Sequence, residues 1–224
     1  MSSRQEEKER RRKEREEREL AAAAKAKRGR LLQLIGGVVV ACAIVAGVAF
    51  AVSSGGGSGG GDDIDDAALT SAATAAGCVY RAFPEEGRDH VTKTLTAADY
   101  KTNPPTSGAH NPNPAQDGVY APGNEPAIEN WVHTLEHGRV LFQYRPGTSA
   151  ATVGQLQKLF DEDVKGSGNG YHSVLMQNNS KMQFQVAAVA WRHYMGCREF
   201  TPSSIEALRT FRELLIDTAP EKIP

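Results

Sequence analysis

Apolar residues recur every three or four positions in several segments of the C-terminal part of this chain, a period typical of amphipathic helices. The segment 203–217 has the clearest stripe and follows a Thr-Pro sequence suited to a helix start. Helices are also predicted over 152–164 and over 126–138, which begins with a proline and ends at Gly138. Residues 67–76 (AALTSAATAA) predict a short helix or an ordered extension of the preceding chain.

Three shorter segments are rich in β-branched and aromatic residues and predict strands over 139–144, 171–177 and 182–191. The last two flank 178–181 (NNSK), a sequence suited to a hairpin turn, so we expect these two strands to pair. The resulting order of helix, strand, helix, strand, strand, helix predicts an α+β sandwich. The order also resembles the second half of a thioredoxin-like layout.

Between the first helix and 126–138 the pattern is irregular. Residues 92–100 are polar, and 103–114 (NPPTSGAHNPNP) contain four prolines in twelve residues. Proline density of this kind excludes a helix or a central strand and favours an extended, rigid loop. Such a loop would hold His110 in place.

The N-terminal part has a different pattern. Residues 31–52 form an uncharged apolar run of 22 residues, which as a helix would be about 33 Å long, enough for one membrane crossing. The run is longer than the apolar core of about 7–15 residues that a cleaved secretory signal has, so we expect a retained anchor. It is followed by a linker of Gly, Ser and Asp over 53–66 and by a domain over 67–224.

Charge indicates the orientation of this anchor. Residues 1–30 carry 12 Lys and Arg against 7 Glu, and a basic flank stays on the cytoplasmic side of the membrane, which places 67–224 outside. The tail is either a solvated helix that fixes topology or a segment that contacts anionic lipid or a cytoplasmic partner. Residues 53–224 carry 14 basic and 20 acidic residues, which argues against nucleic-acid partners.

Cysteine usage agrees with export. Cys42 lies within the predicted span, which leaves Cys78 and Cys197 near the two ends of the domain. In an oxidising compartment this pair most simply forms a disulfide. A reactive thiol or a thiolate metal ligand are the alternatives, and no CxxC pair is present to indicate thioredoxin-type redox chemistry.

Histidines supply the candidate chemistry. His133 and His137 are separated by four residues, which places both on one face of the predicted helix. His90 and His110 lie upstream, so four of the six histidines fall between residues 90 and 137. Three or four imidazoles suit Zn(II) or Cu(II). We therefore predict one zinc or copper site made by His90, His110, His133 and His137.

Other residues have alternative interpretations. Each of the four candidate ligands could instead be a hydrogen-bonded structural histidine. His172 and His193 have no partner motif and are expected to be ordinary surface or half-buried residues. Glu136 completes an HxxEH pattern, in which the glutamate of a zinc hydrolase activates water. We expect Glu136 to neighbour Trp131 and Gly138 rather than to face His133 and His137, and so to orient a ligand or cap a loop donor.

The blocks PPTSGAH at 104–110 and HTLEHG at 133–138, together with Gly87–Val91, Ala190-Trp191 and Pro220-Glu221, resemble a chiefly actinobacterial family. Its members are typically membrane-anchored and are classified only as a domain of unknown function. The resemblance spans about residues 77–221 and implies that the four histidines and Glu136 are the residues to test.

Three interpretations of the function therefore remain. We expect a metal-binding domain of the cell envelope rather than an enzyme. The alternatives are a structural or interaction module without metal, and a zinc-dependent hydrolase that uses Glu136.

Overall fold

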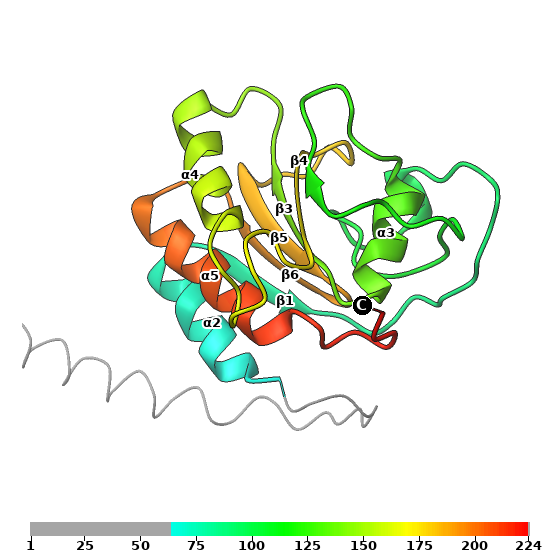
Figure 1. The fold of residues 1–224 in the computed structure, drawn as a ribbon, viewed down its shortest axis with the longest axis horizontal. Coiled ribbons are helices and arrows are strands. Elements are labelled where there is room, and N and C mark those ends of the chain that lie inside the picture. The colour runs from blue at the N-terminus through cyan, green and yellow to red at the C-terminus, as the bar shows by residue number, and fades with distance from the viewer. Residues whose placement is uncertain (1–63, 224) are drawn as a thin grey trace, which may run out of the picture. The chain divides into compact units, whose positions relative to one another are not determined.

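A computed structural model describes residues 64–223, in which six strands form one mixed sheet that carries helices on both faces (Figure 1). The strand order is β1-β6-β5-β3-β4-β2. In chain order the elements are α2 (Asp66–Ala75), β1 (Val79–Ala82), the 3₁₀ helix η2 (Ala97–Asp99), β2 (Gly118–Val119), α3 (Ile128–Glu136), β3 (Val140–Tyr144), α4 (Ala150–Phe160), β4 (Ser173–Gln177), β5 (Val186–Ala190), β6 (His193–Cys197) and α5 (Pro202–Leu215).

The four predicted helices are confirmed as α2 to α5, with ends that differ by a few residues. Helices α2 and α4 start with ordinary capping chemistry, in which a side-chain oxygen satisfies an amide that lacks a partner inside the helix, whereas α3 starts after Ala127 without a side-chain cap. Asp65 Oδ1 accepts from the Ala68 amide at 2.8 Å, and Ser149 Oγ accepts from the Thr152 amide at 3.2 Å. At α5 the predicted Thr-Pro start is present, with Thr201 as the cap.

The α+β class is confirmed, but the predicted strand pairing is wrong. Strand β4 runs parallel to β3, to which α4 connects it, and β5 runs antiparallel to β3 and β6. Because β3 separates β4 from β5, residues 178–181 do not form a hairpin turn. The hairpin lies between β5 and β6, where Arg192 has a φ of 67°. An arginine at positive φ carries no turn signal in the sequence, so this hairpin and β6 are missed.

Burial on both faces explains the continuous apolar run of β5. Val186, Ala188 and Ala190 lie in a core with residues of α2, α4 and α5, whereas Ala187 and Val189 lie in a second core with residues of α3. Figure 1 shows the same division, with α2, α4 and α5 on one face of the sheet and α3 on the other. The expected sandwich therefore has three layers. Helix α3, which carries His133, lies on the face opposite α2, α4 and α5 (Figure 1).

Cys78 and Cys197 lie where β1 and β6 pair, at the edge of the first core. Their Sγ atoms are 1.96 Å apart, at disulfide bonding distance, as predicted. Neither cysteine is therefore available as a free thiol or as a metal ligand.

The predicted tail at 1–30, the predicted span at 31–52 and most of the linker lie outside the described residues. Within 64–223, no helix is long and apolar enough to cross a membrane.

Candidate metal centre

Main-chain hydrogen bonds bring three distant segments together at one end of α3. The Val91 amide donates to the His110 carbonyl at 2.7 Å, and the His110 amide donates to the Asp89 carbonyl at 3.0 Å. His90 and His110 are therefore neighbours across a short parallel bridge. The Asn111 amide donates to the Glu129 carbonyl at 3.0 Å, which joins the proline-rich loop to α3.

The rings of His90, His110 and His133 form a nearly equilateral triangle. Their centroids are separated by 4.9, 4.8 and 4.7 Å. Bonds of about 2.0–2.1 Å from a tetrahedral zinc to two imidazole nitrogens place the ring centroids about 5 Å apart. Donor atoms of these three histidines and of Glu136 all lie within 4.8 Å of one another. The spacing is therefore compatible with ligands of one ion.

Backbone carbonyls fix the tautomers of the two buried rings. His110 Nδ1 lies 2.8 Å from the Gly108 carbonyl oxygen, and His133 Nδ1 lies 2.7 Å from the Asn111 carbonyl oxygen. A carbonyl oxygen only accepts, so each Nδ1 carries the proton and donates it. Each Nε2 then presents a lone pair to the centre of the group. Metal-bound histidines usually have this arrangement, in which the second nitrogen donates to a carbonyl or a carboxylate.

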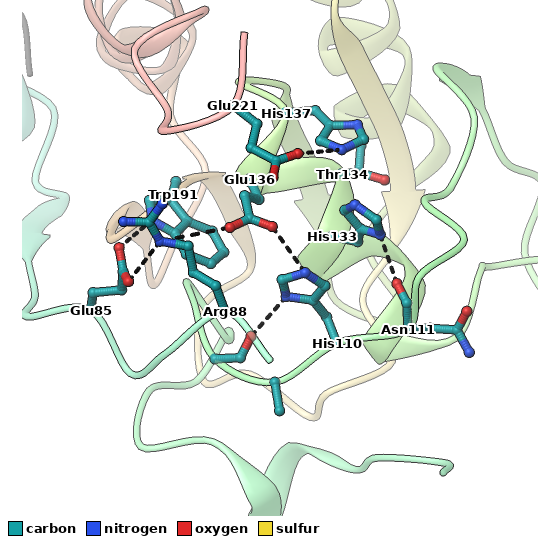
Figure 2. Close-up of polar contacts among 12 residues, drawn as sticks. Glu85, Arg88, His110, Asn111, His133, Thr134, Glu136, His137, Trp191 and Glu221 are labelled. Atoms are coloured by element: carbon teal, nitrogen blue, oxygen red, sulfur yellow. Dashed lines mark hydrogen bonds and ion pairs between the residues drawn. The ribbon is translucent and has the colours of Figure 1, made fainter. Parts of the chain in front are cut away.

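Glu136 faces the same centre. Figure 2 shows its carboxylate between Arg88 and His110, with Oε2 at 3.0 Å from His110 Nε2 and Oε1 at 3.8 Å from Arg88 Nε. The side chains of Glu136 and His110 are 2% and 0% exposed. Within 64–223, His110 Nε2 and Glu136 Oε1 have no hydrogen-bond partner of acceptable geometry. The oxygen that faces His110 Nε2 is Oε2, so an imidazole nitrogen and a carboxylate oxygen lie 3.0 Å apart there, while Oε1 faces Arg88.

Burial shifts the pKa values of these groups toward their neutral forms. Burial, followed by the Glu221 carboxylate, raises the pKa of Glu136 to about 7, and Arg88 opposes this rise. Burial also lowers the pKa of His110 and of His133, although their carbonyl partners oppose it. A cation at the centre would stabilise the ionised carboxylate and use the neutral imidazoles at the same time.

Arg88 is positioned by a chain of side chains at the rim of the group. Trp191 Nε1 donates to Glu85 Oε2 at 3.2 Å, and Arg88 Nε donates to Glu85 Oε1 at 2.8 Å. These contacts hold a half-exposed guanidinium beside Glu136 (Figure 2). Arg88 therefore favours the ionised form of the carboxylate without covering it.

The structure brings His90, His110 and His133 together, and it places Glu136 rather than His137 as the fourth member. The expectation that Glu136 does not face the histidines is wrong, because its Oε2 lies 3.0 Å from His110 Nε2. The spacing of three residues from His133 carried this signal, since positions i and i+3 share a helix face. His137 instead joins a second group with His133 and Glu221. No local sequence pattern connects Glu221 to the site.

His172 and His193 are both buried, rather than surface or half-buried. His172 Nδ1 lies 2.6 Å from Asp217 Oδ1, and His193 Nδ1 lies 2.8 Å from the Tyr80 hydroxyl. Neither belongs to a candidate metal group in the described part of the chain. Both are structural hydrogen-bonding residues.

Comparison with known proteins adds a family assignment. No curated protein and no solved structure matches this chain. The model of one family, described as a protein of unknown function (DUF3105), matches residues 90–221. This range covers both candidate metal groups and more than half of the chain. The chain therefore belongs to the DUF3105 family.

Proposed function

We propose that this protein binds one zinc or copper ion through His90, His110, His133 and Glu136. The observation that carries the proposal is the buried contact between His110 Nε2 and Glu136 Oε2 at 3.0 Å. Because His110 Nδ1 holds the proton, an ionised Glu136 leaves two acceptors in contact without a donor between them. Unpaired buried acceptors are costly, and a cation between them removes the cost.

The donor set favours a particular class of ion. Three imidazole nitrogens with one carboxylate oxygen suit Zn(II) or Cu(II). Softer Cu(I) prefers sulfur ligands, and the only cysteines within 64–223 are paired with each other on the opposite face of the sheet. We therefore expect a divalent ion.

A polar network without metal is the main alternative, and the raised pKa of Glu136 favours it. A protonated Glu136 would donate to His110 Nε2 and satisfy both atoms with a proton in place of an ion. This network would require no strong affinity for any metal. Metal analysis therefore separates the two interpretations.

The hydrolase alternative gains less from the geometry. A glutamate that activates water lies close to the metal-bound water without itself being a ligand. Here a Glu136 carboxylate oxygen lies within 4.8 Å of a donor atom of each of the three imidazoles, as a ligand would. If Glu136→Gln kept the metal and abolished a hydrolytic activity, this alternative would replace ours.

The direct test is titration of the full chain, purified in detergent without chelator, with Zn(II) and with Cu(II). We expect one ion per chain, and we expect His133→Ala to abolish stoichiometric binding and His110→Ala to weaken it by about 100-fold or more. His172→Ala is the control, because His172 is also buried but belongs to neither group. Wild-type protein that binds neither ion more tightly than His133→Ala would establish the structural module instead.

We also propose that the domain is extracytoplasmic and tethered by residues 31–52. The charge excess before this span and the cysteine pair at bonding distance both support export. Protease added to spheroplasts should digest the C-terminal domain. Complete protection in intact spheroplasts, with digestion only after lysis, would place the domain in the cytoplasm.

The finer fold proposal is a thioredoxin-like core. A β3-α4-β4 unit with parallel strands is followed by the antiparallel β5-β6 pair and α5, in the spatial order β4-β3-β5-β6. Helices α4 and α5 lie on the same face (Figure 1). In this proposal the metal site occupies the opposite face, with no CxxC pair in the chain.

A further inference from the structure

We propose that His133, His137 and Glu221 form a second, outer metal position through which the ion reaches and leaves the inner one. The inner position is the site proposed above, and this inference rests on that proposed function. What is new is a loading step, with Glu221 as a ligand that acts only during exchange.

The three donors of the outer position already converge. Their donor atoms all lie within 4.8 Å of one another. His137 Nε2 lies 3.2 Å from Glu221 Oε2, and the ring centroids of His133 and His137 are 4.4 Å apart. Figure 2 shows the Glu221 carboxylate directed at His137. Two imidazoles and a carboxylate are three protein ligands, the number that catalytic zinc sites use when a fourth position is left for water.

His133 belongs to both positions, yet it has one free lone pair. Its Nδ1 is committed to the Asn111 carbonyl, which leaves Nε2 alone for a metal. One nitrogen lone pair binds one ion at a time. The inner and outer groups are therefore two alternative places for the same ion, and His133 is the ligand common to both.

Glu221 is held at the end of α3 by main-chain contacts. Its amide donates to the Glu136 carbonyl at 3.1 Å, and the Asp217 amide donates to the Gly138 carbonyl at 2.9 Å. Arg139 Nη1 donates to the Ile223 carbonyl at 2.6 Å. Carbonyls at the end of a helix have no partner within it, so the C-terminal segment docks there with a defined register. This register fixes the Glu221 side chain beside His137.

Exposure gives the exchange a direction. The side chains of His137 and Glu221 are 12% and 42% exposed, whereas those of His110 and Glu136 are 0% and 2% exposed. His90 is a ligand of the inner position and is exposed, so solvent reaches the group from two sides, and the proposed route is the one past His137 and Glu221. Along this route the ion moves inward by exchanging His137 and Glu221 for His110 and Glu136 while it remains bound to His133. Three ligands outside and four inside favour the inner position at equilibrium.

Exchange kinetics distinguish this route from a single site. With Zn(II) alone, the wild-type full chain and Glu221→Gln would be compared by stopped-flow association and by dissociation into excess chelator. We expect Glu221→Gln to slow both rates by about tenfold while the dissociation constant shifts by less than about threefold. His110→Ala should instead weaken equilibrium binding by about 100-fold or more. Glu206→Gln removes an exposed acid on α5 and is the matched control, with both rates as in wild type.

A double variant tests the outer position directly. His110→Ala should retain weak binding of Cu(II) at the outer donors, and His110→Ala with His137→Ala should lose it. Equal weak binding by the single and double variants would refute the outer position. The electron paramagnetic resonance spectrum of Cu(II) in His110→Ala should change when Glu221→Gln is added, because the carboxylate is then a ligand.

Three further results would overturn the proposal. Rates insensitive to Glu221→Gln and His137→Ala would show that the ion bypasses these residues. A loss of affinity in Glu221→Gln equal to that in His110→Ala would show one undivided site. His90 is exposed as well, and slow exchange in His90→Ala with no loss of affinity would place the route on that side. Failure of the wild-type chain to bind Zn(II) or Cu(II) is a different result, since it removes the proposed function itself.

Discussion

At the scale of single residues, the candidate centre is organised by two backbone carbonyls. The carbonyls of Gly108 and Asn111 each accept from the Nδ1 of a buried histidine, which leaves the Nε2 lone pairs of His110 and His133 available to an ion. The spacing of histidines in the sequence predicts that His133 lies near a partner. It contains no information about which ring nitrogen is protonated, because that depends on loop carbonyls far along the chain.

Protonation of Glu136 should control metal affinity near neutral pH. Its pKa is raised to about 7, mainly by burial, so below this pH a proton competes with the ion for the carboxylate. The affinity of the wild-type protein should fall by about one log unit per pH unit below pH 7. Because the pKa values of His110 and His133 are lowered, protons compete with the ion for these imidazoles only below about pH 6.5.

Glu136→Gln is the corresponding variant, because it keeps the size of the side chain and removes the charge. We expect its affinity at pH 8 to be lower by about 10–100-fold or more and to be nearly constant between pH 7.5 and 6.5. Chelator competition at each pH measures both quantities. An unaltered pH profile in Glu136→Gln would show that another group takes up the proton.

At the scale of elements, the junction of α3 with the C-terminal segment determines where the site can form. Gly138 ends α3 with a φ of 83°, and a Cβ atom at this position would lie 2.9 Å from the Asp217 Cα. Only glycine permits this turn and this approach together. The same junction positions His137 and Glu221.

Gly138→Ala should therefore lower the free energy of unfolding by about 1–3 kcal/mol, through strain and through displacement of the C-terminal segment. Gly154→Ala is the matched control, because Gly154 lies within α4 with nothing within 4 Å of the added Cβ. That substitution should stabilise the protein by about 0.5–1 kcal/mol. Urea denaturation of both variants measures the contrast, and equal effects would contradict the role assigned to Gly138.

The elements also show how far the sequence predicts the fold. Helices are predicted because their apolar stripes and caps are local, as at Thr201 before α5. Strands β1 and β2 are missed because they are short edge strands of four and two residues, with largely exposed side chains. The partners of β4 and β5 are also mispredicted, since a local turn signal at 178–181 cannot report that β3 lies between them.

At the scale of the whole molecule, the larger core and the candidate metal centre lie on opposite faces of the sheet. The face covered by α2, α4 and α5 holds the larger core and the cysteine pair, and the face covered by α3 holds the candidate centre. Substitutions at the centre should therefore alter metal binding with little effect on the first core. The free energy of unfolding can therefore be measured in the absence of metal.

Reduction of the cysteine pair should lower the free energy of unfolding substantially. Cys78 and Cys197 are 119 residues apart in sequence, and closure of a loop of this length contributes about 4–5 kcal/mol in the chain-entropy model. Thermal melts with and without reductant measure this contribution. The double variant Cys78→Ala with Cys197→Ala should resemble reduced wild type, and it should be insensitive to reductant.

His193 should make the first core sensitive to acid. Its ring is 8% exposed, and burial lowers its pKa to about 4, against an unfolded value of about 6.5. The unfolded chain therefore binds more protons between these values, so stability is complete above pH 6.5 and declines as the pH falls toward 4. A difference of about 2.5 pKa units corresponds to about 3 kcal/mol over this range.

In His193→Gln, which retains a donor for Tyr80, this share of the acid dependence should disappear. Urea denaturation at pH 7, 6 and 5, in the presence of chelator so that metal release does not contribute, compares the two proteins. Parallel curves of stability against pH in wild type and variant would show that His193 is not the group that takes up the proton.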